Sequence, residues 1–298
     1  VQRMGTTSML DAHAQIAIPF ETDFIIPLYL KRDSFGDLRE TPNVRRLLTE
    51  ILANPFVRRG EMSDIDVDQI MAHLAEPTYA GVVEAVFRTW ALRRNKTRWG
   101  DKNPGVLHVH HLNALFPDAL FLHLIRDGRD VTASRMRIKT WRQCSVILLA
   151  HHWCWMVTGL RRAGQTLGER YKEIRYEDLV RSPEETLRNV CAWIGEAYEP
   201  EMLDYHHTAA SRMPQELVRT EHRSSVSPLD QSKIGVFRRL MSRGDRAVFQ
   251  TIAQQLLVDL QYELEDDRSL GFRMGRKFSE LSHAIRGLAV FPFPGSQR

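Results

Sequence analysis

The sequence predicts an α/β protein in which a parallel sheet is flanked by helices, with a helical insertion. Short apolar segments alternate with helical segments along the second part of the chain. Residues 119–125 form an almost unbroken apolar run, as buried parallel strands do. The composition, 43% hydrophobic and 26% charged over 298 residues, is that of a globular protein. We expect one domain over residues 1–298, with the insertion at about 36–95 and a C-terminal extension at about 266–298.

Helical periodicity defines the insertion. Residues 65–75 and 78–94 carry apolar side chains at helical spacing, and Ser63 or Asp64 is placed to cap the first of these helices. The apolar residues that share one face of the second helix are Val82, Val83, Val86, Phe87 and Trp90.

After the insertion, the pattern changes to strands and helices in turn. Ser182, followed by Pro183 and Glu185, is a strong helix start, and Gly195 is a helix end. In parallel sheets, ligands bind beyond the carboxyl ends of the strands, so functional residues are expected there. The predicted strands are 97–102, 118–126 and 172–176, and the predicted helices are 106–116, 130–139 and 145–167.

Composition excludes several classes of protein. The formal charge of +4 and the pI near 9.0 suit an anionic ligand, but no basic patch interleaved with aromatic residues indicates nucleic acid. The most apolar stretch, 146–157, is short and contains His151 and His152, so we expect no membrane span. Residues 1–10 lack the apolar core of a signal peptide. We therefore expect a soluble, cytoplasmic protein.

Neither cysteines nor histidines indicate a metal site. The three cysteines are odd in number and lack CxxC spacing, which argues against a disulfide framework or a zinc site and favours a reducing compartment. His108 and His111 can share a helix face, but no carboxylate or Cys is spaced to complete a ligand set. We expect no metal.

The segment Arg-Met-Gly-Thr-Thr at residues 3–7 has the character of an anion-binding loop. A glycine turn lets backbone N–H groups approach a phosphate, a following helix adds its positive end, and Thr6 and Thr7 supply further donors. The loop lacks the Lys of a Walker A motif, so it does not predict a standard ATPase or GTPase site. The other interpretation is an ordinary N-terminal turn.

A second anion pocket is predicted where the strand 118–126 ends. Arg126 stands at its carboxyl end, before a glycine turn, and Ser134 follows eight residues later in the first turns of the next helix. A guanidinium held there can bind a phosphate through two parallel hydrogen bonds. The other interpretation is that the charged residues 126–130 pair only with one another.

Two further residues face the same sheet edge. Lys102 ends a short strand before Pro104, and its charge is placed to neutralise a leaving phosphate. Tyr176 ends another strand, where a capping aromatic half in the core is the alternative interpretation.

These segments together resemble the sulfotransferases that use 3′-phosphoadenosine-5′-phosphosulfate (PAPS), and most closely the bacterial branch that is similar to tyrosylprotein sulfotransferases. The resemblance extends from Arg3 to about Leu240. It implies a P-loop NTPase-like fold, PAPS as donor, adenosine 3′,5′-bisphosphate (PAP) as product, and no metal. The motifs that carry it are RMGTT, GDKNP, FPDALFLHLIRDGRDVTAS and IRYEDLVRSPEETL.

The resemblance also implies a set of nucleotide-binding residues. Residues 3–7 would bind the 5′-phosphosulfate, and a segment within 223–239 would close over the nucleotide. The individual contacts are Arg3, Gly5, Thr6 and Thr7 at the 5′-phosphosulfate, Arg126 and Ser134 at the 3′-phosphate, Tyr176 at the nucleotide, Ser224 or Ser225 at the phosphosulfate, and Lys233 in the closing segment.

The catalytic base implied by the resemblance is a glutamate. Cytosolic phenol sulfotransferases carry a histidine just after the strand-end lysine, whereas here Asn103 and Pro104 follow Lys102. In the tyrosylprotein-like branch a glutamate follows the first helix, and Glu21 matches it. Glu21 would accept the proton of the attacking hydroxyl during in-line displacement, while Lys102 and Arg3 stabilise charge on the bridging oxygen. A solvated loop carboxylate is the other interpretation of Glu21.

Two features depart from the family pattern. Only two residues precede Arg3, where the family has an apolar strand, and Ser8 alone separates Thr7 from Met9, where the family has a longer segment. Losing about three helical residues shortens a helix by about 4.5 Å and rotates the next part of the chain by roughly 300°. A catalytically weakened PAP- or nucleotide-binding module is therefore the alternative function. A P-loop kinase using ATP is a third candidate, against which the missing loop lysine counts.

The acceptor and the oligomeric state stay open. A hydroxyl on a small molecule, lipid, glycan or peptide tyrosine would fit, and a homodimer is one option for the assembly.

Overall fold

A computed structural model describes residues 4–19, 22–59, 62–102, 108–138, 141, 143–207 and 227–266. Its strands form two parallel pairs. Strand β1 (Ile16–Ala17) pairs with β2 (Arg98–Trp99), and β3 (Phe121–Ile125) pairs with β4 (Tyr171–Arg175). The register aligns Phe121 with Tyr171 and Ile125 with Arg175, so β3 and β4 end together. The parallel pairing confirms the predicted α/β class, although the described strands form two separate two-stranded sheets.

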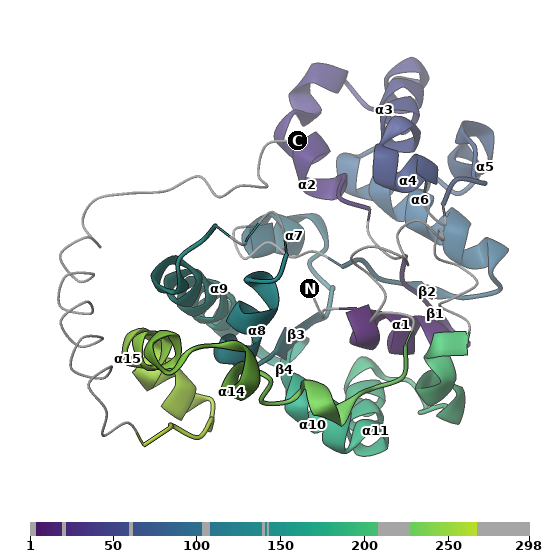
Figure 1. Cartoon of the computed structure of the whole chain (residues 1–298). Helices are drawn as coiled ribbons and strands as arrows, with labels where there is room; N and C mark the ends of the chain where they lie inside the picture. Colours follow the sequence, from purple (N-terminus) through teal and green to yellow (C-terminus); the bar gives the residue numbers. More distant parts are fainter. Residues whose placement is uncertain are drawn as a thin grey trace.

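Helices surround both strand pairs (Figure 1). The α-helices are α1 (Met4–Ala12), α2 (Ile25–Leu30), α3 (Thr41–Ala53), α4 (Pro55–Arg59), α5 (Val67–Met71), α6 (Tyr79–Arg93), α7 (Val109–Leu115), α8 (Gly128–Arg135), α9 (Val146–Leu167), α10 (Tyr176–Arg181), α11 (Pro183–Ile194), α14 (Phe237–Leu240) and α15 (Arg243–Asp259). Short 3₁₀ segments are η1 (Arg32–Phe35), η3 (Gly168–Arg170), η4 (Pro200–Asp204) and η6 (Gln231–Lys233). The described helices include no candidate transmembrane span.

Strand β3 is less buried than its apolar sequence predicts. Phe121, Leu122 and Leu124 are each half-buried, and only Ile125 is fully buried. Within the described part of the chain, β4 lies on one side of β3 and no strand pairs with its other edge. The apolar run therefore correctly indicated a parallel strand but overestimated its burial.

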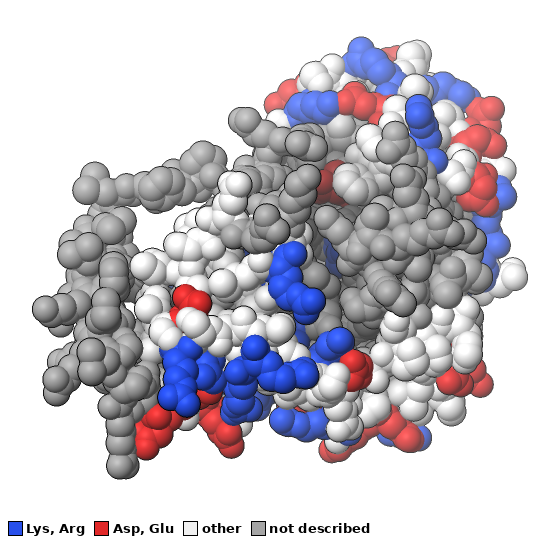
Figure 2. Space-filling model, viewed as in Figure 1, with Lys and Arg blue, Asp and Glu red and all other residues white. Residues whose placement is uncertain are grey.

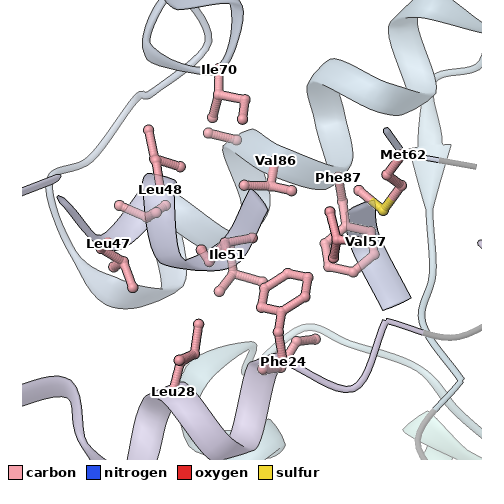
Figure 3. Packing of buried hydrophobic residues seen from close by; sticks show 14 of the residues in the cluster. Phe24, Leu28, Leu47, Leu48, Ile51, Val57, Met62, Ile70, Val86 and Phe87 are labelled. Carbon is pink, nitrogen blue, oxygen red and sulfur yellow. The ribbon is translucent and has the colours of Figure 1, made fainter. Parts of the chain in front are cut away.

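Helices α2 to α6 form a lobe at the upper right of Figure 1 with a hydrophobic core of its own. Figure 3 shows Phe24, Ile51 and Phe87 at the centre of this core. Helix α6 agrees with the expected 78–94, because Thr78 caps it by accepting the N–H of Gly81. The five residues expected on its inner face are all buried.

Helix α5 is shorter than the expected 65–75, and its cap was predicted at the wrong residue. Asp66, rather than Ser63 or Asp64, accepts the N–H of Gln69 at 2.9 Å. The side chain of Gln69 accepts the N–H of Asp66 in return, which satisfies two backbone donors reciprocally. This reciprocal pair of hydrogen bonds favours Asp66 as the N-cap of α5 over Ser63 and Asp64.

Two further cores hold the part of the molecule that carries the strand ends. One joins α8, α9, α14 and α15 around Trp153, Phe237 and Phe249. The other joins α1, β4, α10 and α11 around Met9 and Leu187. Helix α11 begins after Ser182 as expected, although the Ser182 side chain makes no capping hydrogen bond, and its C-cap is Gly195 in the left-handed conformation (φ +79°).

Candidate functional site

Arg126 and Tyr176 lie side by side at the carboxyl ends of β3 and β4. Each residue directly follows its strand, and the strands are in register up to Ile125 and Arg175. The Arg126 guanidinium lies over the Tyr176 ring, with 4.4 Å between the guanidinium carbon and the ring centroid, and both side chains are buried. Tyr176 is the first residue of α10 rather than the last of the strand. The two residues predicted at this edge are therefore brought together.

The edge of the Arg126 guanidinium is only partly satisfied within the protein. Its Nη2 donates to the carbonyl oxygen of Lys233 and lies 3.4 Å from Asp130 Oδ2. Its Nε is buried and has no hydrogen-bond partner among the described residues. Because a buried charged donor without an acceptor is costly, this nitrogen fits a site that receives an anion. Lys233 itself pairs with Asp230 through Nζ at 3.5 Å, with about half of its side chain exposed.

Helix α8 begins at Gly128, two residues earlier than expected. Asp127 caps it by accepting the N–H of Arg129 at 2.9 Å. Ser134 consequently lies in the last turn of α8 rather than in its first turns. Gly128 belongs to the helix and not to a glycine turn: a Cβ there would lie 2.3 Å from the Trp153 ring.

The interpretation that these charged residues pair with one another is correct for one pair. Arg129 holds Asp127 through Nε and Nη2, at 3.0 and 2.7 Å from the carboxylate oxygens, and both side chains are buried. Arg126 and Asp130 make a longer contact. Arg129 therefore has a structural role, whereas Arg126 Nε has no hydrogen-bond acceptor among the described residues.

Residues 4–7 of the predicted phosphosulfate loop are helical and begin α1, so Gly5 belongs to the helix and not to a glycine turn that precedes it. Gly5 and Thr6 lie in its first turn, where backbone N–H groups point out of the helix end. Thr6 is buried, and its Oγ1 has no hydrogen-bond partner in the described structure, while Thr7 is half-buried. Arg3 lies outside the described residues. The orphaned Thr6 hydroxyl, next to a helix N-terminus, fits an anionic ligand.

The hydrophobic side chains of α1 share a core with β3 and β4. Met9 and Leu10 are buried in the same core as Ile174 of β4, and Leu124 of β3 packs against that core. Figure 1 shows α1 beside this strand pair. The two predicted anion-binding segments are thus built on one packed unit.

Lys102 follows a strand that is anchored by aromatic residues. Trp99 of β2 stacks on Phe87 of α6 with ring centroids 4.6 Å apart. Asp101, adjacent to Lys102, accepts a hydrogen bond from the buried Thr22 hydroxyl at 2.9 Å. Thr22 follows Glu21 in the chain, so the chain neighbours of the two predicted catalytic residues are joined. Glu21, Ser224 and Ser225, and the tail from residue 267, lie outside the described residues.

Positive side chains gather on the face that carries α8 and α14. Figure 2 shows several Lys and Arg side chains in the centre and lower part of this view, where Figure 1 places α8 and α14, with Asp and Glu side chains below them. Such a surface favours the approach of an anionic ligand.

The histidines of α7 lie close together. The rings of His110 and His111 are 3.9 Å apart, and burial lowers the pKa values of His108 and His111. No group of three or more His, Cys, Asp or Glu in the described ranges is arranged to hold a metal ion. Cys144 and Cys191 are free thiols.

Sequence reasoning missed the role of Asp130. Its carboxylate accepts backbone N–H groups from Gly235 and Phe237, more than one hundred residues away. Only its i,i+4 spacing from Arg126 is visible in the sequence, and that spacing indicates an ion pair.

Comparison with known proteins identifies a family and several relatives of this chain. Residues 1–200 match the profile of the sulfotransferase family. The protein-tyrosine sulfotransferase of Drosophila melanogaster is 26% identical over 221 residues, which cover 70% of this chain and 38% of that protein. The chain thus spans about two fifths of the length of this curated relative.

Two solved structures share the fold. The sulfotransferase domain from the Synechococcus PCC 7002 olefin synthase is 22% identical, with a TM-score of 0.59 over 88% of this chain and 92% of that domain. The sulfotransferase domain from the curacin biosynthetic pathway is 19% identical, with a TM-score of 0.55 over 88% and 95%. Together with the profile match over two thirds of its length, this shows that the chain belongs to the sulfotransferase family.

Proposed function

We propose that this protein transfers the sulfuryl group of PAPS to a hydroxyl acceptor. The observation that carries the proposal is the buried Arg126 guanidinium over Tyr176, with an unpartnered Nε at the strand ends. A doubly charged 3′-phosphate is the part of PAPS that fits such a guanidinium. Ser134 and Lys233 would complete this end of the nucleotide site, and Tyr176 would contact the nucleotide.

The other end of the nucleotide would be held by the start of α1. The backbone at Gly5 and the hydroxyls of Thr6 and Thr7 would bind the 5′-phosphosulfate, together with Arg3 and Ser224 or Ser225. The buried, unpartnered Thr6 Oγ1 supports this assignment. When bound, PAPS supplies an activated sulfuryl group with PAP as the leaving group.

The residues of this chain would act on the proton and on the developing charge. Glu21 would accept the proton of the acceptor hydroxyl, a contribution of roughly 10²- to 10⁴-fold in rate. Lys102 and Arg3 would stabilise negative charge on the bridging oxygen, without a metal. The Thr22–Asp101 hydrogen bond supports a common location for Glu21 and Lys102, because it joins their neighbours.

Nucleotide binding and transfer test the proposal separately. Calorimetry should show PAP binding much more tightly than ATP, and a preference for ATP would favour a kinase and refute the proposal. An acceptor screen with PAPS should then give a mass gain of about 80 Da on one class: phenols and other small molecules, lipids, glycans, or peptide tyrosines. PAP binding without transfer to any class would instead support a catalytically weakened nucleotide-binding module. Repeating the screen with a chelator tests whether sulfuryl transfer is independent of a metal, as proposed.

Glu21→Gln tests the proposed base. We expect kcat to fall at least about a hundredfold while PAP affinity stays unchanged, because the amide cannot take the proton. Glu76→Gln, an exposed glutamate of the helical lobe, is the control and should be silent. Turnover near that of the unmodified enzyme in the Glu21 variant would remove this residue from the mechanism.

We also propose a cytoplasmic location, which the free thiols of Cys144 and Cys191 support.

A further inference from the structure

Asp130 joins two segments that are remote in sequence. Its side chain is fully buried at the first turn of α8. Oδ2 accepts the N–H of Gly235 at 2.8 Å, and Oδ1 accepts the N–H of Phe237 at 2.9 Å. One carboxylate therefore holds the turn between η6 and α14 by both of its oxygens.

Backbone conformation and packing both define this turn. Gly235 has a φ of +72°, a conformation that favours glycine. Phe237 is buried, and the Arg129 guanidinium lies 4.3 Å from its ring centroid. The turn thus requires a conformation that favours glycine at residue 235 and is packed into the core at Phe237, and Asp130 accepts the N–H groups of both residues.

The same turn and the same carboxylate define the position of Arg126. The carbonyl oxygen of Lys233, two residues before Gly235, accepts a hydrogen bond from Arg126 Nη2, and Asp130 Oδ2 lies 3.4 Å from that nitrogen. The Tyr176 ring lies against one face of the guanidinium. The group is therefore restrained through Nη2 and one face, while Nε remains without a partner among the described residues.

We propose that Asp130 is a positioning residue, which holds the 233–237 turn and the Arg126 guanidinium in the arrangement that binds the 3′-phosphate of the nucleotide. The inference rests on the proposed function. Burial raises the pKa of Asp130, so a charged carboxylate at this place is a poor choice for stability alone. The three groups that donate hydrogen bonds to Asp130 are Arg126 Nη2 and the N–H groups of Gly235 and Phe237, so its carboxylate links Arg126 to the turn.

The test is Asp130→Asn in the full chain, with two nucleotides that differ only in the 3′-phosphate: PAP and adenosine 5′-monophosphate (AMP). Asparagine keeps one acceptor oxygen and places an NH₂ donor against a backbone N–H. We expect PAP affinity to fall roughly 10- to 100-fold, as for the loss of one or two charge-assisted hydrogen bonds, and AMP affinity to change less than about twofold.

A second variant disturbs the same turn without touching the carboxylate. Alanine at Gly235 is strained at the positive φ and brings a Cβ within 3.1 Å of Arg238 Nη1. Gly235→Ala should show the same selective loss, and it decides the question if Asp130→Asn does not fold.

Gln250→Leu is the matched control. Gln250 is buried and also holds a loop by two backbone hydrogen bonds, to the O and N–H of Glu265 at 2.9 and 2.8 Å. It should lower the melting temperature without changing the ratio of PAP to AMP affinity.

The outcomes distinguish a failure of the role of Asp130 from a failure of the proposed 3′-phosphate site. Equal weakening of both nucleotides, or no weakening of either, would overturn the role of Asp130, because a merely structural residue acts on both alike. If the unmodified protein binds PAP no more tightly than AMP, the proposed 3′-phosphate site itself fails.

Discussion

Gly128→Ala should destabilise the protein although alanine is the better helix former. An ideal Cβ at Gly128 would lie 2.3 Å from Trp153 Cδ2 and 2.5 Å from Phe249 Cζ. Both rings are almost fully buried, at 4% and 0% exposure, so neither has space to move away. Overpacking of this kind costs about 1–3 kcal/mol, which exceeds the gain of up to about 1 kcal/mol in helix propensity. Part of the strain should reach the proposed nucleotide site, because Trp153 Nε1 donates to the carbonyl oxygen of Arg126.

Chemical denaturation with a fixed m-value measures this cost. Gly244→Ala is the control, since its Cβ would meet nothing closer than 3.8 Å in the first turn of α15. We expect the control to be neutral or slightly more stable, and Gly128→Ala to lose at least about 1 kcal/mol. Equal stability of the two variants would show that the close packing at Gly128 relaxes at no cost, and would refute the reasoning.

Three further predictions address the site and its surroundings. Arg126→Lys should weaken PAP binding about tenfold or more by calorimetry, because an ammonium keeps the charge but lacks the planar edge; a change below twofold would contradict the phosphate assignment. Thr22→Val removes the hydroxyl that donates to Asp101. With the sulfuryl acceptor found in the screen, this variant should lower kcat several-fold at unchanged PAP affinity. Loss of PAP binding instead would place Thr22 in the nucleotide site. Burial lowers the pKa values of His108 and His111 below 6.5, so protonation favours the unfolded chain. The stabilisation should be complete above about pH 6.5 and should decline as the pH falls. A melting temperature that rises on acidification would contradict this prediction.

Local signals predicted the elements that depend on local contacts. Helix α6 begins at its Thr78 cap and α9 at its Ser145 cap, and α11 ends at a left-handed glycine. Prediction was poorer where two local signals competed, as at the start of α5, where Asp66 wins because Gln69 returns its hydrogen bond. The burial of β3 was overestimated, because apolar sequence reports a preference for burial and not the number of neighbouring strands.

The site was predictable where a residue follows directly from a strand. Arg126 and Tyr176 could be assigned to one edge, since the carboxyl ends of parallel strands meet there. The contacts of Asp130 with Gly235 and Phe237 could not, because they join residues separated by more than a hundred positions. No periodicity or motif spacing carries that information.

Two arginine–aspartate pairs lie close together at the start of α8. They differ in which groups donate hydrogen bonds to the aspartate. Asp127 gives both oxygens to the Nε–Nη2 edge of Arg129, so that edge is closed. Asp130 accepts backbone N–H groups through both of its oxygens, and its contact with Arg126 Nη2 is long, at 3.4 Å. Arg126 Nε has no hydrogen-bond partner among the described residues. The same residue types therefore make one close ion pair and one longer contact, and the difference arises from a turn that only the folded chain brings there.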